Sequence, residues 1–128
     1  MALKRPLTFL MPVRNVESSL TATVNLVLEM ASDLGERFEL LVIDDSSSDA
    51  THEMARELSR YYPQIRTLRL SKPMGEEAAL RAGFAQSRGD VVFVRGGARP
   101  TFERITWASQ PVRPNYLGRS RSLVREGL

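Results

Sequence analysis

The chain has 128 residues, no cysteine and a formal net charge of +3, and 42% of its residues are hydrophobic and 26% charged. This size fits one domain with a buried core, and the balance of apolar and charged residues excludes a disordered chain. No apolar run approaches the ~20 residues of a membrane helix, and the lack of cysteine excludes disulfides and thiolate metal sites. We therefore expect a cytoplasmic protein with no integral membrane segment.

Short apolar runs alternate with helical patterns in the first part of the chain. Residues 7–11 form an apolar run, and apolar side chains then recur at helical spacing over residues 20–34. Glu17 is expected in the first turn of this helix and Gly35 just past its end, as helix polarity prefers. A second apolar run, residues 38–43, ends abruptly at a pair of aspartates.

The same alternation continues through the middle of the chain. Residues 49–62 have the spacing of a helix, with Asp49 as its expected N-cap. Residues 65–70 mix arginine with apolar side chains, which suits an edge strand. Residues 76–87 are alanine-rich and predict a third helix, and residues 91–94 form a fourth buried run.

Strands that alternate with helices of about 10 to 15 residues predict right-handed βαβ units and a mainly parallel sheet. The runs are continuously apolar, so both faces of the sheet are expected to be covered. The predicted fold class is therefore α/β, a three-layer α/β/α arrangement with a mainly parallel, Rossmann-like sheet over residues 1–100. Residues 101–128 are predicted to be a C-terminal basic extension of uncertain structure, with a short helix over residues 102–109.

Arginine dominates the charges in the last part of the chain. A basic tail can meet phosphates, nucleic acid or anionic lipid. This one lacks the interleaved aromatic residues of a stacking platform, so we interpret it as a solvated terminus and expect no nucleic-acid partner. Only Glu103 and Glu126 oppose the arginines from residue 95 onward, which are Arg95, Arg99, Arg104, Arg113, Arg119, Arg121 and Arg125.

The polar residues that follow each apolar run are the candidates for a site. In an open parallel sheet, ligands bind beyond the carboxyl ends of the strands, near the point where strand order reverses. Asp44 and Asp45 follow the second run, and adjacent carboxylates repel each other unless a ligand, a cation or backbone donors stabilise them. They can accept hydrogen bonds from a base or a ribose. The alternative is that Asp45 caps its turn and Asp49 caps the next helix.

The segments around the first and second apolar runs do not match the common nucleotide-binding motifs, and they match a receiver domain only in part. No Gly-x-Gly-x-x-Gly follows the first run, so neither a dinucleotide-binding fingerprint nor a phosphate-gripping P-loop is present. The acidic end of residues 42–45 resembles the first strand of a phospho-acceptor receiver domain. That hypothesis needs a later strand ending in aspartate, and residues 91–94 end at Arg95.

The sequence resembles family-2 glycosyltransferases in segments that occur in the family's order. Residues 12–17 resemble the opening Pro-x-x-Asn-x-Glu, and residues 39–51 resemble Glu-Leu-Ile-Val-Val-Asp-Asp-Gly-Ser-x-Asp-x-Thr. Residues 70–83 resemble the stretch Asn-x-Gly-x-x-x-Ala-x-x-x-Gly, and residues 89–94 the Gly-Asp-hydrophobic strand before the family's metal motif. The resemblance covers most of the chain and implies the nucleotide-binding half of a GT-A fold.

The resemblance also implies roles for residues at the strand ends. Pro12 and Asn15 would lie beside the nucleotide of a nucleoside diphosphate or nucleotide sugar. Asp45 would contact the base or the ribose, and Asp44 would support it. 

Two cationic residues take their implied roles from the third segment. Lys72 would lie near the uracil or guanine ring, and Arg81 near the phosphates.

One departure from the family decides the predicted function. The family's Asp-x-Asp, which holds Mg²⁺ or Mn²⁺ against the diphosphate, aligns with Arg95, Gly96 and Gly97. No carboxylate occurs between Asp90 and Glu103, so we expect no metal and no other cofactor. Either Arg95 replaces the metal by binding the diphosphate, or the site is degenerate and Arg95 is a surface cation. We favour the degenerate site, because a motif is more easily lost than re-engineered.

The predicted function is therefore a family-2-like domain that binds, or once bound, a nucleotide sugar, with weak or no transferase activity. Transfer needs a base for the acceptor hydroxyl, and neither Glu103 nor His52 is assigned that role, so no catalytic residue is proposed. The alternatives are a non-catalytic scaffold and metal-independent glycosyl transfer through Arg95. Full family members continue beyond this length, so we also expect the exposed face to support a homo-oligomer, such as a dimer.

Overall fold

The computed structural model describes residues 6–87, 90–107 and 123–127. Within these ranges, no helix combines the length and the apolar character needed to cross a bilayer. The elements in chain order are β1 (Leu7–Val13), α1 (Leu20–Asp33), β2 (Phe38–Asp44), α2 (Thr51–Tyr61), β3 (Ile65–Arg69), α3 (Glu76–Ala85), β4 (Asp90–Arg95), β5 (Thr101–Trp107) and β6 (Leu123–Gly127).

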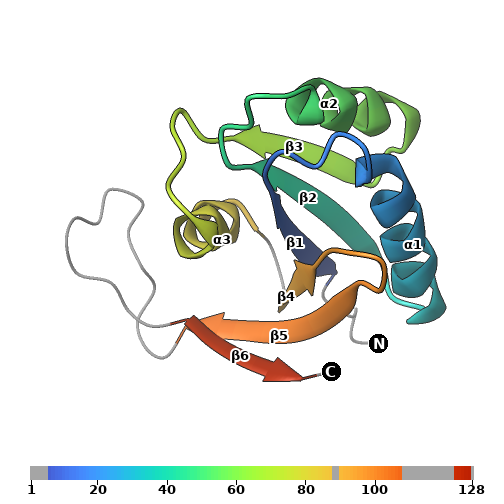
Figure 1. Cartoon of the computed structure of the whole chain (residues 1–128). Coiled ribbons are helices and arrows are strands. Elements are labelled where there is room, and N and C mark those ends of the chain that lie inside the picture. The colour runs from blue at the N-terminus through green and yellow to red at the C-terminus, as the bar shows by residue number, and fades with distance from the viewer. Residues whose placement is uncertain (1–5, 88–89, 108–122, 128) are drawn as a thin grey trace.

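The strands form one six-stranded sheet in the order β3-β2-β1-β4-β5-β6. Strands β1 to β4 are mutually parallel, whereas β5 and β6 pair antiparallel. Helices α1 and α2 cover one face of the sheet and α3 covers the other, which confirms the three-layer α/β/α fold (Figure 1). The chain moves outward from β1 to β3 and then returns to place β4 on the other side of β1, so strand order reverses between β1 and β4.

Two apolar clusters hold the three layers together. Phe9 and Met11 of β1 face α1 and α2, while Leu10 between them faces α3. The same alternation in β2 and β4 explains why the strand sequences are continuously apolar, since each face has its own helical cover. Gly83 of α3 lies against this sheet so closely that a Cβ there would stand 2.6 Å from Ile43 Cδ1.

The first strand is longer than the apolar run that predicted it. Pro12 lies inside β1, opposite Ile43 of β2, rather than after the strand. The pairing of β1 with β4 ends at Leu10 and Phe93, so Pro12, which has no N–H to donate, lies beyond that ladder. The strand end that borders the reversal point is therefore open on its β4 side.

Two helix starts differ from the prediction. Glu17 precedes α1 instead of lying in its first turn. Asp49 is not the N-cap of α2, because that position is occupied by Ala50. Asp49 still accepts a hydrogen bond from the first turn of α2, since its Oδ1 accepts the N–H of Thr51 at 2.9 Å. Both acidic residues contact a neighbouring loop, which a helix-by-helix analysis of the sequence does not consider.

The helix predicted over residues 102–109 is wrong. Residues 101–107 form β5, which pairs with β4, and residues 108 and 109 lie outside the described part of the chain. Phe102 packs in the cluster beneath α1 and α2, whereas Ile105 packs in the cluster beneath α3. Residues three apart share one face of a helix but lie on opposite faces of a strand. The β-branched and aromatic residues of this segment also favour a strand.

Candidate functional site

The loops that follow β1 and β2 are tied together around Asn15. Its backbone N–H donates to Ser47 Oγ at 2.8 Å, and its side-chain Oδ1 accepts the N–H of Ser48 at 2.8 Å. Asn15 has a φ of +52°, a left-handed conformation that asparagine tolerates better than most residues. Asn15 therefore holds two loops at the carboxyl edge of the sheet, with its side-chain oxygen already engaged.

Glu17 and Asp49 form a second tie between the same loops. The N–H of Glu17 donates to Asp49 Oδ2 at 3.2 Å, and Glu17 Oε1 accepts the N–H of Ala50 at 3.0 Å. The hydroxyl of Thr51, followed by backbone N–H donors, lowers the pKa of the Asp49 carboxyl below its ordinary value of 3.8. The acidic residues of both segments are thus structural ties that fix how the two loops meet.

Asp44 is fully buried at the end of β2 and has its own partners. Its Oδ2 accepts the N–H of Ser47 at 3.2 Å, and its Oδ1 accepts the Ser47 hydroxyl. Arg69, opposite it at the end of β3, places Nε 3.4 Å from Asp44 Oδ2. The guanidinium offsets the buried negative charge. Arg69 was not among the predicted site residues, although a register that aligns the ends of β2 and β3 would have suggested this pair.

Asp45 is also buried, and it faces the loop between β3 and α3. Its two carboxylate oxygens accept the N–H groups of Met74, at 2.7 Å, and Gly75, at 2.9 Å. Gly75 has a φ of +95° and immediately precedes α3, where a side chain would strain the backbone. The backbone donors and Arg69 thus offset the repulsion that was expected between the adjacent carboxylates of Asp44 and Asp45. Asp45 fixes the loop that carries Lys72.

The remaining cationic candidates lie along α3 and at the end of β4. Lys72 is exposed in the loop before α3. Arg81 of α3 places Nη2 3.4 Å from Glu77 Oε2. Arg95 places Nη1 3.8 Å from Glu76 Oε2, and its guanidinium carbon lies 5.1 Å from the centroid of the Phe93 ring. Both arginines therefore contact a glutamate in the first turn of α3, and neither glutamate was predicted to belong to the site.

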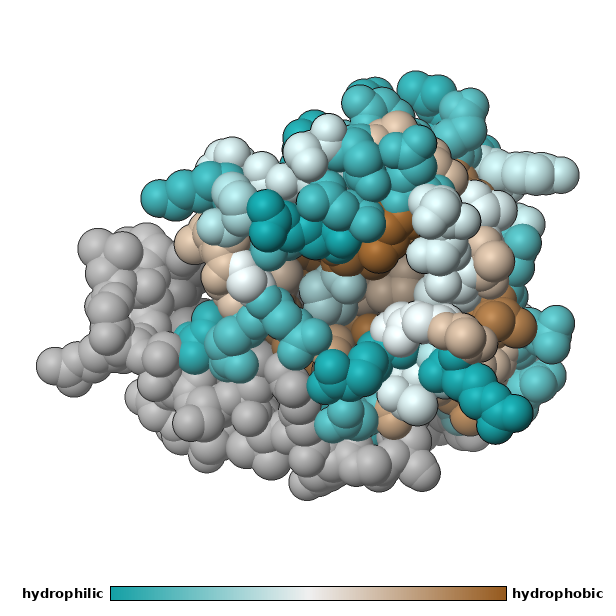
Figure 2. Space-filling view, viewed as in Figure 1, coloured by the Kyte–Doolittle hydropathy of each residue, from teal (hydrophilic) through white to brown (hydrophobic). Residues whose placement is uncertain are grey.

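A small cavity lies at the reversal point between β1 and β4. Its volume is about 240 Å³, and it is lined by Met11, Pro12, Val13, Arg14, Val16, Ser19, Leu20, Thr23, Gly96 and Gly97. Of the predicted site residues, Pro12 belongs to this lining. The volume is below the range of about 300 to 1,000 Å³ typical of ligand pockets, so the cavity has room for only part of a nucleotide. Figure 2 shows apolar residues in a hollow near the centre of the face shown, ringed by hydrophilic residues.

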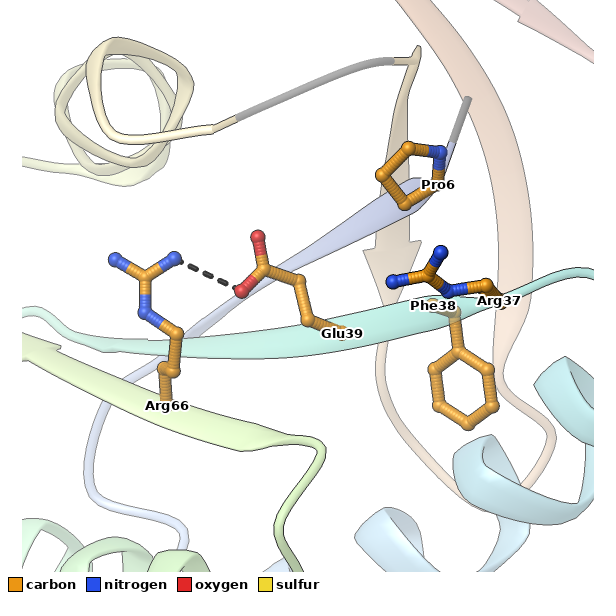
Figure 3. Close-up of a pocket in the computed structure, with 5 residues that line it drawn as sticks. All are labelled: Pro6, Arg37, Phe38, Glu39 and Arg66. Atoms are coloured by element: carbon orange, nitrogen blue, oxygen red, sulfur yellow. Dashed lines mark hydrogen bonds and ion pairs between the residues drawn. The ribbon is translucent and has the colours of Figure 1, made fainter. Parts of the chain in front are cut away.

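A larger cavity of about 480 Å³ lies at the opposite edge, near the amino ends of β1 and β2 (Figure 3). Its lining includes Pro6, Phe38 and Arg37. The only carboxylate drawn there, that of Glu39, is already bonded to Arg66 at 2.8 Å and to the hydroxyl of Thr8 at 3.0 Å (Figure 3). Ligands of parallel α/β sheets bind at the carboxyl ends of the strands, so this cavity is not the candidate site.

The described side chains do not suit a divalent cation. Nowhere in residues 6–87, 90–107 and 123–127 do three or more His, Cys, Asp or Glu side chains gather in a way that would hold a metal ion. At the place of the family's Asp-x-Asp, Arg95 contributes a positive charge instead of oxygen ligands. No metal-dependent step is therefore assigned to these residues.

A mainly parallel α/β sheet, with polar loops and a cavity beside its reversal point, places the chain in the class of open-sheet α/β domains, which bind their ligands at this edge. The comparison with known families identifies the particular one. The model of glycosyl transferase family 2 matches residues 8–94, more than half of the chain, so the chain belongs to that family.

The chain spans about a quarter of the length of the curated relatives it matches. It is 35% identical over 82 residues to an undecaprenyl-phosphate 4-deoxy-4-formamido-L-arabinose transferase of Pectobacterium carotovorum, covering 63% of this chain and 25% of the relative. It is 35% identical over 92 residues to a dolichyl-phosphate beta-glucosyltransferase of Trichomonas vaginalis, covering 68% of this chain and 27% of the relative.

Solved structures show the same fold at low sequence identity. The mannosyltransferase PcManGT of Pyrobaculum calidifontis, solved with GDP-Man and Mn²⁺, matches with a TM-score of 0.60 and 19% identity over 70% of this chain and 27% of its own. TarS of S. aureus, solved with UDP-GlcNAc, matches with a TM-score of 0.58 and 23% identity over 72% of this chain and 26% of its own. These matches confirm the GT-A fold.

Proposed function

We propose that this chain binds a nucleoside diphosphate or a nucleotide sugar at the carboxyl edge of its sheet without a divalent cation, and that it has weak or no transferase activity by itself. The observation that carries the proposal is Arg95, a guanidinium at the end of β4 where the family places its metal motif. We therefore propose the alternative in which Arg95 replaces the metal, in place of the degenerate site favoured on the sequence alone. A guanidinium can pair with two phosphate oxygens at once and so supply positive charge without a metal.

The other predicted residues take roles that their positions allow. Asp45 remains the candidate for the base or ribose, because a carboxylate has about four lone-pair sites and its two hydrogen bonds leave others open. Asp44 supports it by holding the Ser47 turn. Lys72 would approach the base from the loop that Asp45 fixes, and Arg81 would approach the phosphates from α3.

The residues at the start of the site would position the ligand rather than bind all of it. Pro12 lines the cavity beside Gly96 and Gly97, where part of a nucleotide would fit. Asn15 would shape this edge by holding the β1–α1 and β2–α2 loops together. The nucleotide sugars in the complexes of PcManGT and TarS, GDP-Man and UDP-GlcNAc, indicate the class of ligand to test.

A non-catalytic scaffold is the second candidate function. It is favoured by the partners that the site residues already have, since Asp45 holds backbone amides and Arg95 and Arg81 contact glutamates. A site whose polar groups are engaged with one another has a structural purpose without any ligand. If the chain binds no nucleotide, the scaffold is the candidate function that stands.

Calorimetric titration separates the two candidates. Wild-type protein would be titrated with UDP, GDP, UDP-GlcNAc and GDP-Man, each with and without Mn²⁺. We expect binding that Mn²⁺ does not strengthen, and we expect Arg95→Ala to weaken it by about tenfold or more, as for the loss of a charged hydrogen-bond partner. Arg60→Ala in α2, where Arg60 pairs with Glu57, is the matched control and should leave binding unchanged. If the wild type binds none of the four ligands, nucleotide binding is refuted and the scaffold function is favoured.

A further inference from the structure

The first turn of α3 places two glutamates on the two arginines that the proposed function assigns to the phosphates. Glu76 lies 3.8 Å from Arg95, and the next residue, Glu77, lies 3.4 Å from Arg81. The arginines come from different elements, β4 and the middle of α3, yet both reach the same helical turn. The arrangement gives each candidate phosphate-binding cation an anionic partner from within the chain.

The same turn carries a further positive charge that the glutamates offset. The N-terminal end of a helix bears about half a positive charge, and acidic residues in the first turn stabilise it. Gly75 is the N-cap residue of α3, and glycine has no side chain that could cap the helix. A diphosphate would be attracted to this end and to the two guanidinium groups, whereas Glu76 and Glu77 would repel it over the same short distances.

We infer that Glu76 and Glu77 compete with the diphosphate for Arg95 and Arg81, and so lower the affinity of the site in proportion to the negative charge of its ligand. This inference rests on the proposed function. The glutamates act as internal anions, and a ligand must displace them from the arginines in order to bind. The side chains of Glu76 and Arg95 are 44% and 54% exposed, so solvent screens their pair and displacement by a ligand is feasible.

The consequence is a specific pattern of affinities. Replacing either glutamate by glutamine removes one negative charge, keeps a side chain of the same shape and should strengthen binding of UDP. We expect about a two- to fivefold gain for each single variant, the range for exposed ion pairs, and a larger gain for the double variant, which need not equal the product because the two residues are neighbours. The gain should be smaller for UMP and absent for uridine, because these ligands carry less charge or none.

The test measures the affinities of UDP, UMP and uridine by calorimetry for the wild type, Glu76→Gln, Glu77→Gln and the double variant. Glu57→Gln is the matched control, since Glu57 pairs with Arg60 on α2, across the sheet from α3, and its loss changes the net charge equally. Circular dichroism and the urea midpoint of each variant establish that it is folded. Inorganic pyrophosphate serves as a probe of the diphosphate contacts without a nucleoside.

The outcomes separate this inference from the proposed function. A gain for UDP and pyrophosphate that diminishes from UDP to uridine, and that Glu57→Gln does not reproduce, supports it. If the wild type binds UDP and Arg95→Ala weakens that binding while Glu76→Gln and Glu77→Gln leave it unchanged, the competition is refuted and the proposed function stands. Equal gains for UDP and uridine refute it as well. If no nucleotide binds to any of the proteins, both proposals are overturned.

Discussion

Ser46 has a φ of +56°, the left-handed region that disfavours side chains. The family pattern has glycine at this position, directly after the aspartate pair that closes β2, and glycine adopts this conformation without steric cost. The chain turns back at Ser46, because the N–H and the hydroxyl of Ser47 both donate to the carboxylate of Asp44. The strain at Ser46 therefore follows from the hydrogen bonds that hold the buried carboxylate.

Ser46→Gly is expected to stabilise the protein by about 0.5 to 1 kcal/mol, because the relief of left-handed strain exceeds the entropy that glycine adds to the unfolded chain. The free energy of unfolding would be measured by urea denaturation. Ser48→Gly is the control, since Ser48 has no positive φ and should only lose stability. A loss of stability in Ser46→Gly would mean that its side chain contributes more than the turn geometry indicates.

The pH dependence of stability should include a contribution from Asp49. The Thr51 hydroxyl lowers the pKa of the folded carboxyl below 3.8, so the unfolded chain binds this proton at higher pH than the folded chain does. The contribution is present above the unfolded pKa and is lost as the pH falls through the folded one. We expect Asp49→Asn to flatten the decline of the unfolding free energy below about pH 4. Urea denaturation between pH 2.5 and 6, repeated for Thr51→Val, would check it, and an unchanged slope in both variants would contradict it.

At the scale of elements, the buried strands were predictable because their signal is strong and local. Three continuous apolar runs became β1, β2 and β4, and the mixed segment predicted as an edge strand became β3, all in the expected parallel arrangement. β5 was missed because Phe102 and Ile105 are spaced like a helical pair and only the position of β4 shows that they face opposite layers. Helix periodicity reports spacing along the chain, whereas β5 depends on a partner strand.

Gly83 shows how closely α3 approaches the sheet. An added Cβ would lie 2.6 Å from Ile43 Cδ1 and 3.0 Å from Leu10 Cδ2, both in the buried cluster beneath α3. Replacing glycine by alanine inside a helix normally stabilises it by about 1 kcal/mol. Here we expect Gly83→Ala to destabilise the protein by about 1 to 3 kcal/mol, because a packed core resists an added methyl group.

The sign of the change therefore tests the packing of α3. Ala85→Gly, at the exposed last residue of the same helix, is the control, and it should lose no more than the helix propensity of about 1 kcal/mol that glycine costs in a helix interior. Both would be measured by urea denaturation at one pH. A stabilising effect of Gly83→Ala would contradict the prediction and mean either that the side chains of Ile43 and Leu10 shift at little cost or that α3 lies farther from β1 and β2.

At the scale of the whole molecule, the edge of the sheet that carries the candidate site was predictable, but the partners of its residues were not. Parallel topology gathers the ends of β1 to β4 at one edge, so Asp45, Lys72 and Arg95 could be assigned to it from the order of segments alone. Which atoms they contact depends on the loop conformation. The donors of Met74 and Gly75 to Asp45, and the contact of Glu76 with Arg95, join residues about 20 to 30 positions apart that no local pattern connects.

Self-association is the prediction that concerns the whole chain. The sheet order leaves β3 and β6 as its two edges, and β3 carries Arg66 and Arg69, charged side chains of the kind that discourage pairing between edges. We therefore expect copies to associate through the carboxyl edge or the C-terminal residues and not through β3. Static light scattering should give a mass that rises above the monomer value of 14.4 kDa with concentration. Met74→Lys, at the exposed side of the carboxyl edge, should lower that mass, whereas Tyr61→Lys on α2 should leave it unchanged. A monomer mass at every concentration would contradict the prediction, and a loss of association in Tyr61→Lys alone would move the interface to the α1 and α2 layer.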